Sequence, residues 1–186
     1  MSTTAAASEQ QMAEIACAAL PPKPHVLIGG LGFGFTLRRV LELCPAGATV
    51  DVAELLPEVI AWNRAYLAEV NGRLLDDPRV RIHVGDVGGL IERCGNDRYH
   101  AILLDVDNSP DPLVQAGNAR LYDRGGIART HAALHPGGRV VFWSANRDSA
   151  FEKSLERVFQ RVECISAKAY PQAKRFTHTL FVADRG

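Results

Sequence analysis

The 186-residue chain has no long apolar run and no excess of charge of either sign. A membrane-spanning helix needs roughly 18 or more consecutive apolar residues, and no segment of the sequence reaches that length. Twenty-one basic and 21 acidic side chains cancel to a formal net charge of zero, which gives no long-range field to hold DNA or an anionic membrane. We therefore expect a small-molecule substrate, with neither a nucleic acid nor a membrane as partner.

Cysteine is scarce and scattered, at Cys17, Cys44, Cys94 and Cys164. Because no C-x-x-C pair occurs, the spacing argues against a zinc knuckle and against a disulfide scaffold. The N-terminus lacks a basic leader and carries Glu9 and Glu14, where a signal peptide would have neither. These features predict a cytoplasmic protein.

Apolar residues make up 47% of the chain and charged residues 23%, which is typical of a globular protein. The length supports one domain. An alanine-rich segment from Ser8 to Leu20 predicts a helix that ends before Pro21. We expect residues 1–22 to form a helical extension and residues 23–186 to form a single domain, and the sequence is compatible with a homodimer.

Short apolar runs alternate with segments of helical periodicity along the rest of the chain. The predicted strands are His25–Gly29, Ala48–Ala53, Val80–Val84, Tyr99–Val106, Arg139–Ser144, Arg161–Ser166 and Phe176–Val182. The predicted helices are Thr36–Cys44, Leu56–Val70, Val87–Cys94, Arg120–Leu134 and Ser149–Phe159. This alternation predicts an α/β fold, a doubly wound, mostly parallel seven-stranded Rossmann-like sheet that closes with an antiparallel C-terminal hairpin.

Ligands bind such sheets beyond the carboxyl ends of the strands. The first strand is followed there by Gly30, Gly32 and Gly34, in the segment GLGFG before the next helix. Glycines allow a sharp turn and a close approach of the backbone to a ligand. The spacing differs from the dinucleotide fingerprint, because Phe35 stands at its third glycine, and no Gly-Lys-Ser or Gly-Lys-Thr follows as in a phosphate loop. A tight turn without a ligand is the alternative.

Two acids follow the next two strands. Glu54 ends the second strand, where a carboxylate can accept both hydroxyl protons of a ribose. Asp86 ends the third strand, where it can accept the exocyclic amine of adenine while Val87 donates its backbone N–H. Each acid alone is compatible with a solvated strand end, and Asp86 with a helix N-cap. Together with the glycine loop, and with Leu55 beside Glu54, they predict an adenosine site.

The motifs HVLIGGLGFGFTLRRVLE, VAELLPEVIAWNRAYL, DDPRVRIHVGD, YHAILLDVDNSPDP and LHPGG occur in this order. In them the chain resembles the class I S-adenosylmethionine-dependent transferases, and within that fold the spermidine synthase (polyamine aminopropyltransferase) group. The resemblance covers roughly residues 25 to 138. It implies a cofactor of the S-adenosylmethionine type, with the ribose on Glu54, the adenine on Asp86 and Val87, and the tail on the glycine loop.

The chain departs from that group at three places. The group has an aspartate inside the glycine loop that holds the amine of decarboxylated S-adenosylmethionine, and here the non-glycine positions are Leu31, Phe33 and Phe35. The group has two aspartates three residues apart after the fourth strand; the first matches Asp105, and the second is Asn108, which cannot accept a proton at neutral pH. The small N-terminal β-domain of the group has no counterpart before the first strand.

The segment DVDNSPDP after the fourth strand is the predicted catalytic loop. We assign catalysis to Asp105 and Asp107, with Asp105 also touching the cofactor, and acceptor binding to Asp107, Asn108 and Tyr122. The polar connection Asn108–Gly117 is a candidate lid. No metal site is predicted, because His131 and His135 have helical spacing but no third ligand.

The leading hypothesis is an S-adenosylmethionine-dependent methyltransferase of the spermidine synthase-like group that acts on a small acceptor, for which an amine is one candidate. The first alternative is a spermidine synthase-type aminopropyltransferase that uses decarboxylated S-adenosylmethionine. The second is a non-catalytic nucleoside-binding protein that has kept the cofactor site.

Overall fold

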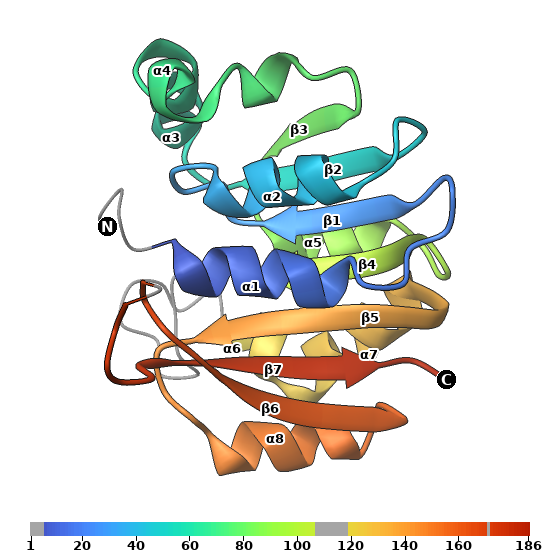
Figure 1. Cartoon of the computed structure of the whole chain (residues 1–186). Coiled ribbons are helices and arrows are strands. Elements are labelled where there is room, and N and C mark those ends of the chain that lie inside the picture. Colours follow the sequence, from blue (N-terminus) through green and yellow to red (C-terminus); the bar gives the residue numbers. More distant parts are fainter. Residues whose placement is uncertain (1–5, 107–118, 171) are drawn as a thin grey trace.

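The computed structural model describes residues 6–106, 119–170 and 172–186. Seven strands form one sheet in the order β3-β2-β1-β4-β5-β7-β6 (Figure 1). The strands are β1 (His25–Gly29), β2 (Thr49–Glu54), β3 (Val80–Val84), β4 (Tyr99–Leu104), β5 (Leu134–Ser144), β6 (Arg161–Ala167) and β7 (His178–Asp184). Strands β1 to β5 are parallel, and β7 is antiparallel to both β5 and β6. The predicted fold class, with its antiparallel C-terminal hairpin, is confirmed.

The helices cover both faces of this sheet (Figure 1). They are α1 (Ala7–Ala16), α2 (Phe35–Leu43), α3 (Pro57–Ala65), α4 (Ala68–Asn71), the 3-10 turn η1 (Leu74–Asp76), α5 (Val87–Arg93), α6 (Ala119–Tyr122), α7 (Arg124–Ala133) and α8 (Ser149–Glu156). The predicted bounds of β1 and β3 match, and most other bounds move by a few residues. The N-terminal helix ends at Ala16 rather than Leu20, and β5 begins at Leu134 rather than Arg139.

The single helix predicted over Leu56–Val70 is wrong. The carbonyl of Trp62 accepts hydrogen bonds from the N–H groups of both Tyr66 (2.9 Å) and Leu67 (3.2 Å), and α3 ends there. The short helix α4 then begins at Ala68. The break gives the chain a new direction after α3, which the helical periodicity of the sequence did not reveal.

The single helix predicted over Arg120–Leu134 is also wrong. Asp123 has an extended backbone, and its carboxylate accepts the N–H of Gly126 at 2.7 Å, which is the geometry of an N-cap at the start of α7. A Cβ at Gly126 would lie 2.0 Å from the carbonyl oxygen of Arg120, so α6 crosses closely over the start of α7. Leu134 opens β5 instead of closing the helix.

The sheet separates two apolar cores, as expected for a doubly wound fold. One face packs against α1 and α2, with buried residues that include Met12, Val26, Ile28, Leu37, Val40, Val52, Leu103 and Val141. The other packs against α5, α7 and α8, with Leu27, Ile91, Ile102, Leu104, Ile127, Phe142, Phe151 and Phe181 among its buried residues. The inner strands β1, β2, β4 and β7 are therefore buried on both faces, which explains why they occur as apolar runs, whereas the edge strands β3 and β6 keep exposed residues.

Helix α1 is part of this packing. Met12 and Ala13 are fully buried, and the Arg139 guanidinium of β5 donates to the carbonyl of Ile15 at 2.9 Å. Within the described ranges, no helix combines the length and the apolar character that crossing a membrane requires. The candidate lid Asn108–Gly117 lies outside the described residues.

Candidate functional site

The carboxyl ends of the central strands bring the predicted cofactor residues to one edge of the sheet. Gly29, the last residue of β1, pairs with Ala53 of β2 and with Leu104 of β4. The glycine loop, Glu54 and Asp105 follow these three positions directly, so the sheet register places them next to one another.

Gly30 can only be glycine in this arrangement. Its φ is +90°, and a Cβ there would lie 2.2 Å from the carbonyl oxygen of Asp105. Its own N–H donates to the carbonyl of Ala53 at 2.8 Å. The loop therefore turns in contact with the residue that follows β4, at a position where a side chain would not fit.

The other two glycines shape the path into α2. Gly32 has φ of +50°, and Gly34 has φ of +83° and occupies the N-cap position of α2. A Cβ at Gly34 would lie 3.1 Å from both Asn63 Oδ1 and Leu74 Cδ1. The loop is therefore packed from the side of α3 and η1.

Glu54 is a buried carboxylate, 8% exposed, that is tied to the backbone. Its Oε2 accepts the N–H of Leu31 and its Oε1 accepts the N–H of Leu56, both at 2.9 Å. The side chain therefore joins the glycine loop to the turn after β2. A carboxylate has about four lone-pair positions, so these two bonds leave it able to accept further hydroxyl protons.

Apolar surface lies next to Glu54. Leu55 is 41% exposed and Leu56 is 50% exposed, so two consecutive leucine side chains are accessible to solvent beside this carboxylate. An exposed apolar side chain beside a carboxylate suits a ligand with a flat apolar ring and hydroxyl groups.

Asp86 is exposed and forms the N-cap of α5, where its Oδ2 accepts the N–H of Gly89 at 2.8 Å. The helix-cap interpretation of Asp86 is therefore correct, and it is compatible with a second role for the other carboxylate oxygen. Val87 is buried. The N–H of Gly85 donates to the carbonyl of Glu54 at 2.8 Å, so the ends of β2 and β3 are fixed to each other.

Asp105 follows β4, and its N–H donates to the carbonyl of Gly29 at 2.9 Å. Tyr122 of α6 lies close enough to Asp105 for the two groups to interact electrostatically. Burial of the Tyr122 phenol, and then the negative charge of Asp105, raise the pKa of this phenol well above its ordinary value. The centroid of the Tyr122 ring lies 5.4 Å from that of Phe151 and 6.1 Å from that of Phe142. Asp107 and Asn108 lie outside the described residues.

Two buried amides that the sequence did not predict lie behind the glycine loop. Asn63 of α3 and Asn71 of α4 are 7% and 6% exposed. Asn63 Nδ2 donates to the carbonyl of Gly32 at 2.8 Å, and Asn71 Nδ2 donates to the carbonyl of Phe33. The only local signal was that Asn63 lies one helical turn after the buried Ile60, at a position where an apolar residue is usual.

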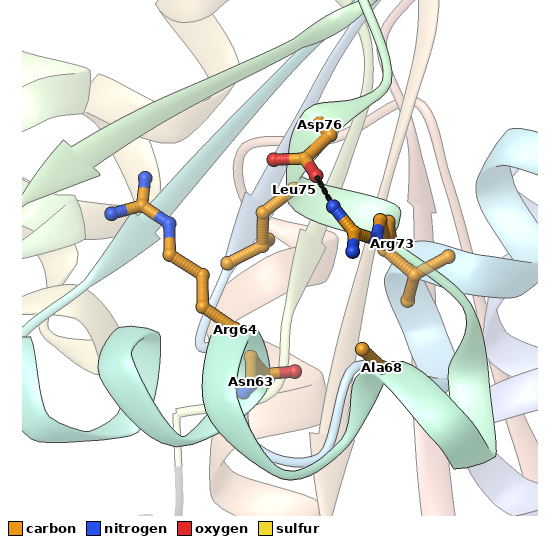
Figure 2. Close-up of a pocket in the computed structure, with 7 residues that line it drawn as sticks. Asn63, Arg64, Ala68, Arg73, Leu75 and Asp76 are labelled. Carbon is orange, nitrogen blue, oxygen red and sulfur yellow. Dashed lines mark ion pairs between the residues drawn. The ribbon is translucent and has the colours of Figure 1, made fainter.

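A pocket of about 230 Å³ lies beside Asn63 (Figure 2). It is lined by Asn63, Arg64, Ala68, Arg73, Leu74, Leu75 and Asp76. Arg73 and Asp76 of this lining form an exposed ion pair at 3.8 Å. None of the described residues predicted for the cofactor or the acceptor lines this pocket, so it lies beside the predicted site rather than within it.

The fold class follows from similarity to solved structures. The chain is similar to spermidine synthase from Thermotoga maritima, with a TM-score of 0.77 and 20% identity, over 96% of this chain and 60% of that one. It is also similar to human methyltransferase-like protein 13 in complex with SAH, with a TM-score of 0.72 and 16% identity, over 97% of this chain and 81% of that one. At these identities the likeness shows the fold alone, which is that of the class I methyltransferases and spermidine synthases.

The family follows from the sequence comparison. The spermine/spermidine synthase domain matches residues 6–179, and the chain belongs to this family. A polyamine aminopropyltransferase from Korarchaeum cryptofilum is 34% identical over 120 residues, which are 64% of this chain and 35% of that protein. Putrescine N-methyltransferase 2 from Nicotiana attenuata is 32% identical over 119 residues, which are 64% of this chain and 30% of that protein. The matched part is about a third of each relative.

Proposed function

We propose that this chain is an S-adenosylmethionine-dependent methyltransferase of the spermidine synthase family, acting on a small acceptor with an amine as the first candidate. The observation that carries the proposal is the apolar character of the glycine loop. Its side chains are those of Leu31, Phe33 and Phe35. Leu31 is buried, and the rings of Phe33 and Phe35 lie edge to face with their centroids 6.3 Å apart. The loop thus offers no carboxylate to the amine of a decarboxylated donor.

The residues at the sheet edge fit a ligand of the S-adenosylmethionine type. Glu54 has lone pairs left for the ribose hydroxyls, and Leu55 offers exposed apolar surface beside them. Asp86 and the N–H of Val87 would hold the adenine, and the N–H groups of the glycine loop would hold the amino-acid tail. S-adenosylmethionine, when bound, supplies a methyl carbon already activated by a positive sulfur.

Transfer of that methyl group is an in-line displacement, so the protein mainly orients the two reactants and keeps the acceptor deprotonated. We assign these tasks to Asp105, together with Asp107. The proximity of Asp105 to Gly30 supports its placement beside the donor, and its influence on Tyr122 supports a shared electrostatic environment. A carboxylate there would attract a cationic amine and accept its proton. Tyr122 and Asn108 would contact the acceptor.

Aminopropyl transfer from decarboxylated S-adenosylmethionine is the alternative. It is favoured by the relatives, which include a polyamine aminopropyltransferase as well as a putrescine N-methyltransferase. In that reaction Asp105 and Asp107 would replace the family pair of aspartates. The neutral net charge supports a small molecule over a nucleic acid as partner in either reaction, and the four free cysteines support a cytoplasmic location.

The deciding experiment follows the transferred group. The purified chain is incubated with putrescine or another diamine and with S-adenosylmethionine carrying an isotopic label in its methyl group, and in parallel with the decarboxylated donor. Mass spectrometry of the amine then separates a gain of one methyl from a gain of an aminopropyl group. Methylated product with the intact donor supports the proposal, and aminopropylated product refutes it in favour of the alternative.

Asp105→Asn tests the catalytic assignment in the same assay. We expect at least a hundredfold loss of turnover with donor binding largely retained, since general base catalysis contributes roughly 10²- to 10⁴-fold. Asp76→Asn is the matched control, because Asp76 is an exposed, ion-paired aspartate away from the predicted site. Donor binding without transfer to any amine tested would point to the non-catalytic nucleoside-binding protein instead.

A further inference from the structure

Two consecutive N–H groups of the glycine loop, those of Gly32 and Phe33, have no hydrogen-bond acceptor among the described residues. The other N–H groups of the loop are taken by Ala53 O (from Gly30), Glu54 Oε2 (from Leu31) and Leu31 O (from Gly34). Adjacent unpaired backbone N–H groups form an anion-binding feature. The loop therefore has donors left for a ligand at its centre.

Asn63 fixes the direction of one of these donors. The carbonyl and the N–H of a trans peptide point in opposite directions, and the described chain has no cis peptide bond. Because Asn63 Nδ2 holds the carbonyl of Gly32 at 2.8 Å on the side of α3, the N–H of Phe33 points away from α3. Among the described residues, Asn63 is the one side chain that holds this peptide group, so the buried amide sets its orientation.

The Asn63 side chain is itself held in one orientation. Its Nδ2 donates a second hydrogen bond to the carbonyl of Val59 at 2.9 Å, so both amide hydrogens are used. Its Oδ1 faces Gly34, where even a Cβ would lie only 3.1 Å away. Arg64, the next residue on α3, leaves the helix in another direction and is exposed (Figure 2).

From this geometry we propose that Asn63 is a positioning residue that presents the Phe33 N–H to the α-carboxylate of the donor, and so makes the site select S-adenosylmethionine over its decarboxylated form. The proposal rests on the proposed function and adds its donor specificity. An N–H that bonds to a charged acceptor gains more than one that bonds to a neutral acceptor. The decarboxylated donor has no acceptor to place there, so it leaves this N–H unpaired.

Calorimetric titration with three ligands tests the proposal. S-adenosylmethionine carries the carboxylate, decarboxylated S-adenosylmethionine lacks it, and 5′-methylthioadenosine lacks the whole amino-acid tail. We expect the wild-type chain to bind S-adenosylmethionine with an affinity about tenfold or more above that for the decarboxylated donor. This difference corresponds to the free energy of one charge-assisted hydrogen bond. In Asn63→Ala we expect that preference to fall to within about twofold, with the affinity for 5′-methylthioadenosine unchanged.

If Asn63 only supports the structure of the loop, Asn63→Ala will bind all three ligands more weakly by a similar factor. That outcome overturns the proposal. Arg64→Ala is the matched control, from the adjacent exposed position on the same pocket wall, and should keep the wild-type preference. Asn63→Ser serves as a second variant if Asn63→Ala does not fold. Should neither fold, equal binding of the two donors by the wild-type chain overturns the proposal on its own.

Failure of this inference is distinguishable from failure of the proposed function. A chain that methylates an amine but binds both donors equally retains the function and loses the donor-selection role of Asn63. A chain that prefers the donor with the carboxylate, loses that preference in Asn63→Ala and produces no methylated product retains the inference and loses the function.

Discussion

The Nε2 atom of His25 lies 2.7 Å from Oδ2 of Asp51, a carboxylate that is 3% exposed in the middle of β2. His83 Nε2 lies 2.9 Å from the other oxygen, and the Tyr99 hydroxyl donates to Oδ2 at 3.1 Å. A single buried acid therefore joins four neighbouring strands of the sheet through their side chains. Burial alone would raise its pKa, but the hydrogen bonds from His25 and His83 lower the pKa of Asp51 to about 2.

This lowered pKa predicts acid sensitivity that depends on Asp51. The stabilisation is fully present above the ordinary pKa of 3.8 and is lost as pH falls through about 2. The shift corresponds to on the order of 2 kcal/mol of unfolding free energy. Urea unfolding at several pH values between 5 and 2 should show the difference between wild type and Asp51→Asn shrinking as pH falls. A difference that does not change with pH contradicts the prediction.

Gly30→Ala should destabilise the chain more than Gly95→Ala. Both glycines have a positive φ, +90° and +80°, so both variants lose about 1–2 kcal/mol for the left-handed backbone. At Gly95 no atom of the described residues lies within 4 Å of the added Cβ, whereas at Gly30 the carbonyl oxygen of Asp105 is 2.2 Å away. We expect a further loss of about 1–3 kcal/mol at Gly30 from this overlap. Equal losses of unfolding free energy in the two variants, measured by urea unfolding, would show that the loop at Gly30 accommodates the added methyl group without a loss of stability.

Phe151→Ala should cost about 3–5 kcal/mol of unfolding free energy. Phe151 is 4% exposed. Its ring makes edge-to-face contacts with Tyr122, Phe142 and Phe181, with ring centroids 5.1 to 5.4 Å apart. Phe176→Ala is the control, because its ring is 63% exposed, and the loss of its contact with Lys168 should cost less than about 1 kcal/mol. Thermal or urea unfolding of both variants gives the comparison, and similar losses would argue against a tightly packed core under Tyr122.

Glu54→Gln should weaken binding of the donor by tenfold or more. Glutamine has one oxygen in place of two, so its NH₂ group would face the N–H of either Leu31 or Leu56, and one of the two hydrogen bonds would be lost. Glu58→Gln, in the exposed first turn of α3, keeps the same change of charge without these contacts. Titration with S-adenosylmethionine measures both variants, and unchanged affinity in Glu54→Gln would remove Glu54 from the proposed site.

The sequence was informative wherever structure depends on local pattern. Strand β1 was predicted at its observed bounds because a short apolar run between a proline and glycines leaves little choice. The helix breaks were missed for different reasons. At Tyr66 the break has no strong local signal. Asp123, followed by Gly125 and Gly126, has the composition of a helix start, but this signal competes with the helical periodicity of the segment.

Some residues of the candidate site could likewise be predicted from local sequence pattern, and others could not. The glycine loop, Glu54 and Asp86 follow strands, so their shared edge could be deduced from the parallel sheet. Asn63 and Asn71 could not be found, because their partners Gly32 and Phe33 lie on a different element and no pattern within α3 or α4 encodes that contact. The ligand contact predicted for Glu54 stays a prediction, and its two hydrogen bonds to the backbone show that it organises the loop.

Leu27 of β1 pairs with Ile102 of β4, and the proposed donor site depends on this pairing. These strands are neighbours in the sheet but far apart along the chain, so pairing them closes a large loop at a cost in conformational entropy. Until β4 has docked, the glycine turn has no Asp105 carbonyl beneath it and no fixed shape. The proposed donor site is therefore complete only once β1 and β4 have paired, although most of its predicted residues belong to other segments of the chain.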